Sequence, residues 1–167
     1  MQMKTLHLLR HAKSDWSDLA LADFDRPLNG RGKKARMIVA DHVAGWKVDR
    51  VVCSPARRAR ATAKPVVKVL RCPVRYEHAL YEAVPERLLG VIRALSDRDK
   101  TVMLVGHNPS LEELTEILCG QSPTYPTAAL ATVELSVERW DDVTAGCGTL
   151  TAFFTPTPPR SVATVVR

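Results

Sequence analysis

Arg10 and His11 are the residues whose types and placement most clearly suggest chemistry. They follow a short apolar run, Leu6-His7-Leu8-Leu9, which has the composition of a buried strand. A strand that ends in this pair places a nucleophilic imidazole beside a guanidinium that binds anions through two donors. The pair is suited to moving a phosphoryl group through a phosphohistidine, although an Arg-His dipeptide alone also occurs by chance.

Two further apolar runs end in residues of matching chemistry. Residues 50–53 lead into Ser54-Pro55 and then Arg57-Arg58, and residues 101–105 lead into Gly106-His107-Asn108-Pro109. Open α/β sheets bind ligands beyond the carboxyl ends of their strands, and a helix N-terminus adds free N–H groups suited to phosphate. We therefore expect three strand ends to converge on one anion site.

Strands and helices alternate along the chain. Apolar runs predict strands over residues 5–9, 50–53, 101–105, 130–137 and 149–154. Helical spacing predicts helices over residues 35–46 and 59–70, a third that opens at Pro85 and a fourth that opens at Pro109 with Asn108 as its N-cap. Pro65 should kink the second helix, because proline lacks a backbone donor.

This alternation predicts an α/β fold, a three-layer sandwich with a mainly parallel central sheet and helices on both faces. No helix-length segment separates the last two strands, so at least one antiparallel pairing is expected there. The length of 167 residues predicts a single domain over residues 1–167. We expect residues 156–167 to form a surface tail.

Composition narrows the function classes. The net charge is +6, but the one dense basic run, residues 57–60, lacks interleaved aromatic residues, so we expect no nucleic-acid partner. No apolar run is long enough to span a bilayer, so we expect no membrane contact. The four cysteines show no C-x-x-C spacing, which favours reduced thiols in the cytoplasm and predicts no metal and no cofactor. A monomer is expected.

Four motifs together carry a resemblance to a known family. They are R-H-A-K-S at residues 10–14, P-L-N-G-R-G at 27–32, S-P-A-R-R-A-R-A-T-A at 54–63 and V-G-H-N-P at 105–109. In this order they resemble the histidine phosphatase superfamily, and the short chain is most similar to its SixA-type phosphohistidine phosphatase branch. The resemblance implies a phosphoglycerate mutase-like fold and a phosphatase that needs no metal.

The resemblance also assigns roles to individual residues. Arg10 and His11 match the family's R-H pair, with His11 as the nucleophile, and His107 matches its second histidine. Arg58, rather than its neighbour Arg57, matches the second arginine. Attack on phosphorus needs a neutral imidazole, and the two arginines and the second histidine would lower the pKa of His11.

The remaining site residues have competing interpretations. Glu82, in Leu80-Tyr81-Glu82, is the candidate proton donor, against a plain surface carboxylate, and Asp15 is a weaker rival. Lys13 and Ser14 either contact the phosphate or only shape a loop. Asn108 is expected to cap a helix first and to contact phosphate second.

The connections between the predicted elements are short, which indicates a shallow and open phosphate pocket. Such a pocket accepts a phosphate on a protein surface, so we expect the enzyme to act on protein phosphohistidine. A phosphatase of small phosphate esters such as sugar phosphates, nucleotides or coenzymes is the first alternative. A phosphate- or phosphoprotein-binding module without turnover is the second, against which the free imidazole argues.

Overall fold

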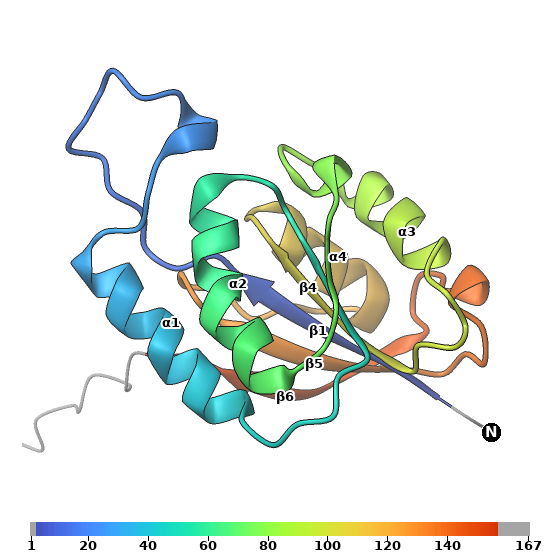
Figure 1. The fold of residues 1–167 in the computed structure, drawn as a ribbon. Helices are drawn as coiled ribbons and strands as arrows, with labels where there is room; N and C mark the ends of the chain where they lie inside the picture. Colours follow the sequence, from blue (N-terminus) through green and yellow to red (C-terminus); the bar gives the residue numbers. More distant parts are fainter. Residues whose placement is uncertain (1–2, 157–167) are drawn as a thin grey trace, which may run out of the picture.

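The computed structural model describes residues 3–156, so all but one residue of the expected surface tail lies outside the described residues. The strands are β1 (Lys4–Arg10), β2 (Arg50–Cys53), β3 (Val74–Tyr76), β4 (Thr101–Gly106), β5 (Leu130–Leu135) and β6 (Gly148–Phe154). The α-helices are α1 (Gly30–Val43), α2 (Arg57–Leu70), α3 (Pro85–Arg93) and α4 (Ser110–Cys119), shown in Figure 1.

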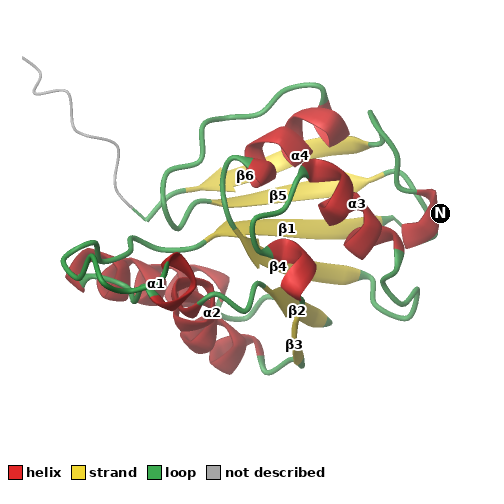
Figure 2. Ribbon diagram, turned by 90° about the horizontal axis from the view of Figure 1, so that it is seen from above, coloured by secondary structure: helices red, strands yellow, loops and turns green. Residues whose placement is uncertain are grey.

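Helices cover both faces of a single sheet. Figure 2 shows α1 and α2 on one side of the strands and α3 and α4 on the other. Each helix pair buries its own apolar cluster against the sheet, with Val39, Val66 and Val105 in one cluster and Leu88, Leu114 and Leu104 in the other. Burying apolar area on both faces stabilises the three layers. The predicted α/β sandwich is therefore confirmed.

The sheet is mixed, which corrects the expectation of a mainly parallel sheet. Its strand order is β3-β2-β4-β1-β5-β6; the first four strands run parallel, whereas β5 is antiparallel to both β1 and β6. The chain after α4 returns to the carboxyl edge of the sheet, where the Tyr125 carbonyl accepts from Arg10 and the Ala128 N–H donates to the His11 carbonyl. Because β5 starts at that edge, it must run in the opposite direction to β1.

Several element boundaries also differ from the sequence predictions. The first helix begins at Gly30, where the Asn29 side chain accepts from the Gly32 N–H at 2.9 Å, and α2 begins at Arg57, two residues before the predicted start, with Pro65 inside it. The edge strand β3 was missed because it has three residues, two of them exposed, so it shows no apolar run.

Candidate active site

His11 and His107 lie side by side because β1 and β4 are parallel neighbours. Arg10, the last residue of β1, pairs in register with Gly106, the last residue of β4. The His11 N–H then donates to the Gly106 carbonyl at 3.0 Å. The two imidazole rings that follow are both buried, with centroids 5.1 Å apart. The expected convergence of these strand ends is thus present.

The protonation of His11 follows from its surroundings. Its Nδ1 lies 2.7 Å from the Ala12 carbonyl oxygen, which can only accept, so Nδ1 carries the proton and Nε2 carries the lone pair. Burial lowers the pKa of His11 to about 4, helped by the charges of Arg58, Arg10 and Arg26 and opposed by the Ala12 hydrogen bond. Burial lowers the pKa of His11 more than the arginine charges do, whereas the sequence prediction rested on the charges.

His107 is held through one ring nitrogen, and its other ring nitrogen is buried. Its Nε2 lies 2.8 Å from the Ser54 hydroxyl oxygen, while Nδ1 is buried without a hydrogen-bond partner among the described residues. Burial, then the charges of His11 and Arg58, lower the pKa of His107 to about 3. Either tautomer of the neutral ring can make this bond, because the Ser54 hydroxyl can donate or accept.

A cavity of about 260 Å³ opens over these histidines. Its lining contains seven residues predicted from the sequence, namely Arg10, His11, Lys13, Ser14, Arg58, His107 and Asn108. Trp16, Arg26 and Thr127 complete it. Four of the lining side chains are basic and none is acidic, so the cavity is suited to an anion.

The two arginines predicted to bind phosphate are anchored on protein acceptors. Arg10 donates through Nη1 to the Tyr125 carbonyl at 2.7 Å. Arg58 donates through Nη1 to the Asp23 carbonyl at 2.7 Å and through Nη2 to the Asp23 carboxylate at 3.0 Å. The Nε atoms of both arginines are buried without a hydrogen-bond partner in the described part of the chain. Each guanidinium is therefore oriented by protein acceptors at the lining of the cavity.

Arg26 is a basic lining residue that the sequence prediction missed. Its guanidinium donates to the Asp23 carboxylate at 2.7 Å and to the Ser14 hydroxyl, and it lies 3.5 Å from the centroid of the Trp16 ring. Its side chain is buried. The sequence signal for it is its position directly before the P-L-N-G-R-G motif at residues 27–32.

Asp23 lies in a single 3₁₀ turn (Asp23–Asp25) and links the guanidinium groups of Arg26 and Arg58. Its carboxylate accepts from Arg26, Arg58 and the Tyr81 hydroxyl, the last at 2.8 Å. Burial alone would raise the pKa of Asp23, but the hydrogen bonds of Arg26 and Tyr81 and the charge of Arg58 outweigh it and hold the pKa well below its usual range. Asp23 is thus a permanent anion that orients the arginines.

The P-L-N-G-R-G motif holds the loop after His11. Ser14 bridges to Leu28, and the Asn29 N–H donates to the Lys13 carbonyl at 3.0 Å. A Cβ on Gly32 would stand 2.2 Å from the same carbonyl oxygen, so only glycine allows this approach. On the other side of the loop, the Ala12 N–H donates to Thr62 Oγ1, which itself donates to the Arg58 carbonyl. The motif therefore positions Lys13 and Ser14.

Three predicted residues lie differently from expectation. Asn108 does not cap α4, whose N-cap is Pro109; its amide instead donates to Glu112 at 2.8 Å. Glu82 is exposed with φ 51° and lies outside the lining of the cavity. Asp15 is exposed as well, and its carboxylate accepts from the Ser17 N–H. Neither carboxylate joins the histidines in this arrangement.

Within residues 3–156, no group of three or more His, Cys, Asp or Glu side chains is arranged to hold a metal ion. No helix in that range is long and apolar enough to cross a bilayer.

The fold and the site define a class of enzyme, α/β phosphatases in which a buried histidine sits among anion-binding arginines. This chain belongs to the histidine phosphatase superfamily, whose branch 1 model matches residues 6–84. An uncharacterised Mycobacterium tuberculosis protein is 34% identical over 165 residues, covering 89% of this chain and 99% of that protein.

Solved structures agree with this assignment. A candidate phosphohistidine phosphatase SixA from Nakamurella multipartitia has a TM-score of 0.81 at 26% identity and covers 95% of this chain and 99% of its own. A candidate SixA from Agrobacterium tumefaciens has a TM-score of 0.79 at 30% identity, covering 92% and 98%. The predicted family and hydrolase class are confirmed.

Proposed function

We propose that this phosphatase works through a phosphohistidine on His11 and that its substrate is protein phosphohistidine. The observation that carries the proposal is the state of His11, a neutral ring whose Nδ1 proton is held by the Ala12 carbonyl. Its Nε2 lone pair is then available in a cavity with four basic side chains. A neutral nucleophile beside anion donors is what attack on a phosphoryl group requires.

In the first step, His11 Nε2 forms a bond to phosphorus while the bond to the substrate's imidazole nitrogen breaks. Arg10, Arg58, Arg26 and Lys13 line the cavity that would receive the transferring oxygens, and His107 lies beside them. Removing one such preorganised donor typically costs about 3–4 kcal/mol of barrier. In the second step, water attacks phosphorus and releases orthophosphate and free His11.

The proton needed by the leaving group favours a phosphohistidine substrate. A phosphohistidine ring that is protonated on its second nitrogen, an imidazole nitrogen with a pKa of about 6.5, leaves as neutral imidazole without an acid at the breaking bond, whereas an alkoxide needs a positioned acid. Asp23 is unsuited to that role, because hydrogen bonds and the charge of Arg58 hold its pKa low. Glu82 stays our proposed donor for ester substrates, and Glu82→Gln should slow ester hydrolysis while sparing phosphohistidine.

The surroundings of the cavity also support a protein substrate. Trp16 is 63% exposed and Leu19 is 89% exposed on the loop that joins β1 to α1, the loop that projects from the molecule in Figure 1. Trp16 also lines the catalytic cavity, so a protein that presents its phosphate there would contact this exposed ring. We place the enzyme in the cytoplasm, where free thiols such as Cys53 persist.

A substrate comparison tests the proposal. We would measure kcat/KM on a protein whose histidine has been phosphorylated with phosphoramidate, beside a panel of sugar phosphates, nucleotides and p-nitrophenyl phosphate. The phosphohistidine protein should win by at least an order of magnitude. A small ester that wins by that margin would overturn the proposed substrate.

Trapping tests the intermediate separately. Brief mixing with substrate should yield an acid-labile phosphoenzyme in the wild type and none in His11→Ala, which should lose turnover. Full activity in His11→Ala would rule out the mechanism. A wild type that binds phosphoprotein without any turnover would instead indicate a binding module.

A further inference from the structure

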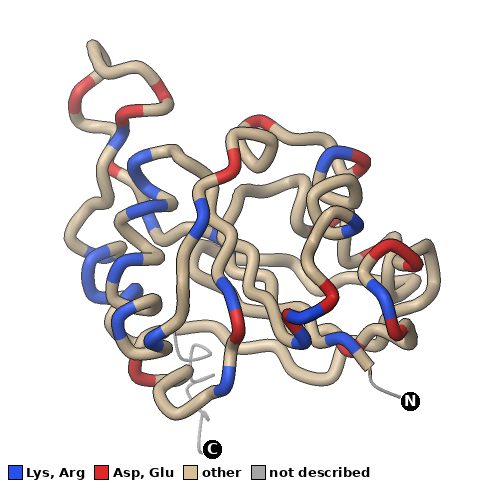
Figure 3. The backbone as a smooth tube through the Cα atoms, turned by 45° about the vertical axis from the view of Figure 1, so that its right-hand side comes forward, with Lys and Arg blue, Asp and Glu red and all other residues tan. Residues whose placement is uncertain are grey.

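The two helical layers carry opposite charge. The helices α1 and α2 together hold nine Lys or Arg residues and a single acid, Asp41, a net charge of +8. The helices α3 and α4 hold two arginines and four glutamates, a net charge of −2. Figure 3 shows the basic positions gathered along α1 and α2. The chain's total of +6 is therefore concentrated on one layer.

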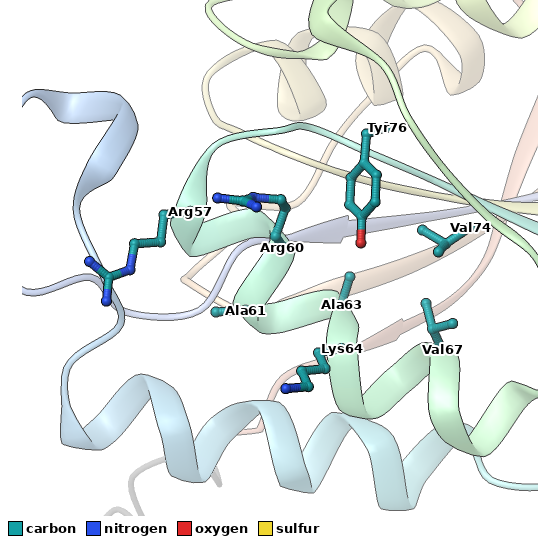
Figure 4. A pocket seen from close by; sticks show the side chains of 8 residues that line it. All are labelled: Arg57, Arg60, Ala61, Ala63, Lys64, Val67, Val74 and Tyr76. Carbon is teal, nitrogen blue, oxygen red and sulfur yellow. The ribbon is translucent and has the colours of Figure 1, made fainter.

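A groove crosses this basic layer between α2 and the edge strand β3. It encloses about 480 Å³, and Figure 4 shows Arg57, Arg60 and Lys64 extending from α2 and Val74 and Tyr76 belonging to β3. Val67 and the two β3 residues supply apolar and aromatic surface, and the three cations border it. The groove therefore offers apolar contact together with positive charge.

The cations of the groove lack anionic partners. None of the five ion pairs found among residues 3–156 includes Arg57, Arg60 or Lys64. All three side chains are exposed, and α2 has no acidic residue to offset them. Unpaired cations around a concave surface attract anions from solution.

The groove adjoins the catalytic cavity. Arg57 lines the groove and the next residue, Arg58, lines the cavity, so the first turn of α2 separates them. A smaller hollow lined by Phe24, Arg60 and Tyr76 lies between, and Phe24 packs on Tyr81 at a centroid distance of 5.1 Å. Tyr81 in turn packs against His107 at 5.7 Å. These ring contacts connect His107, through Tyr81 and Phe24, to the hollow that shares Arg60 and Tyr76 with the groove.

The length of the groove argues for a polypeptide occupant. Arg57 and Lys64 are seven residues apart, which corresponds to roughly 10 Å along a helix. An extended polypeptide covers that distance with about three residues.

We propose that the groove between α2 and β3 binds an acidic segment of the phosphoprotein substrate, a few residues from its phosphohistidine. Carboxylates of this segment would pair with Arg60 and Lys64, and an apolar side chain would pack on Val67 and Tyr76. The inference rests on the proposed function, because it takes the phosphohistidine as given. It adds what the enzyme recognises beyond the phosphate.

Two synthetic phosphohistidine peptides of fifteen residues test the proposal. One carries Asp at the third to fifth positions on either side of the phosphohistidine, and the other carries Asn there. The wild type should turn over the Asp peptide with about tenfold higher kcat/KM, mainly through KM, and added salt should reduce the difference. In Arg60→Gln/Lys64→Gln the preference should fall to within about twofold.

The matched control removes the same charge elsewhere. Arg87→Gln/Arg98→Gln lies on α3 and in the turn after it, at exposed positions, and should keep the tenfold preference. Equal turnover of both peptides by the wild type, or a preference that survives in Arg60→Gln/Lys64→Gln, would overturn the groove. Hydrolysis of p-nitrophenyl phosphate with no turnover of either peptide would overturn the proposed function itself, so the two failures are distinguishable.

Discussion

His11 shows how burial and one backbone carbonyl prepare a side chain for nucleophilic attack. The Ala12 carbonyl fixes the tautomer, and loss of hydration keeps the ring neutral. The charges of the flanking arginines add to this effect. The same side chain at an exposed position would be partly cationic near neutral pH and a poorer nucleophile.

This state of His11 predicts an unusual pH dependence. The neutral ring is the active form, so kcat/KM should rise as pH increases through about 4, the pKa to which burial brings His11, and stay level above it. The profile for p-nitrophenyl phosphate, corrected for the ester's own ionisation, and the His11 ring signals in NMR would measure this. A half-maximal rate near pH 6.5 with matching NMR titration would contradict the assignment.

Arg26 is predicted to matter as much as the arginines found by motif. Lysine keeps the charge but cannot donate to Asp23 and Ser14 at once while stacking on Trp16. Loss of a charge-assisted donor is worth about 1.5–3 kcal/mol, so Arg26→Lys should lower kcat/KM by about 10- to 100-fold. Arg31→Lys, at an exposed position on α1, is the control and should stay near wild type. Equal activities for the two variants would exclude a role for Arg26.

At the scale of elements, the N-terminus of α1 acts as a clamp on the loop after His11. Asn29 caps the helix and also binds the Lys13 carbonyl through its own N–H. The absence of a side chain at Gly32 lets the helix approach this loop closely. A motif that is distant from His11 in sequence therefore determines the shape of the phosphate site.

A pair of glycine substitutions tests the clamp. Gly32→Ala should destabilise the fold by about 1–3 kcal/mol, the usual cost of overpacking, and should lower kcat/KM by moving Lys13 and Ser14. Gly30→Ala in the same helical turn meets nothing within 4 Å and should be neutral or slightly stabilising. Denaturant unfolding and kcat/KM on p-nitrophenyl phosphate would measure both. Equal stabilities for the two variants would show that the loop yields freely.

At the scale of the whole molecule, the central strands carry buried neutral histidines. Burial lowers the pKa of His7 to about 4, and the pKa values of His11 and His107 are lowered to about 4 and about 3. Each ring is less than a tenth exposed. As the pH falls below about 6.5, these histidines therefore take up protons in the unfolded chain before they do so in the folded protein.

This linkage predicts that the folded state weakens on mild acidification. Because the folded pKa values are depressed, stability is fully present above about pH 6.5 and is lost as pH falls towards 4. For His7 the loss at pH 5 is on the order of 2 kcal/mol. Denaturant unfolding should give a lower free energy of unfolding at pH 5 than at pH 8. In His7→Gln this decrease should be smaller by about the contribution of His7. A stability that is equal at both pH values would contradict the burial of neutral rings.

The sequence predicted the residues at the strand ends better than those in the connections. Arg10, His11, Arg58 and His107 were predictable because each follows a buried strand or opens the next helix, and parallel strands bring their carboxyl ends to one edge. Asn108 was misassigned as a cap because its amide finds Glu112 and Tyr125 instead. The direction of β5 was open, because it depends on how the chain returns after α4.

By itself, the sequence determined the alternation of strands and helices, the family and the residues at the strand ends, because these follow from local apolar patterns and short motifs. Only the tertiary structure decided that Asp23 and Arg26 join the site, that the sheet is mixed, and that Glu82 lies outside the cavity. Such contacts join segments distant in the chain, and their energies depend on burial and geometry that appear only when the layers pack.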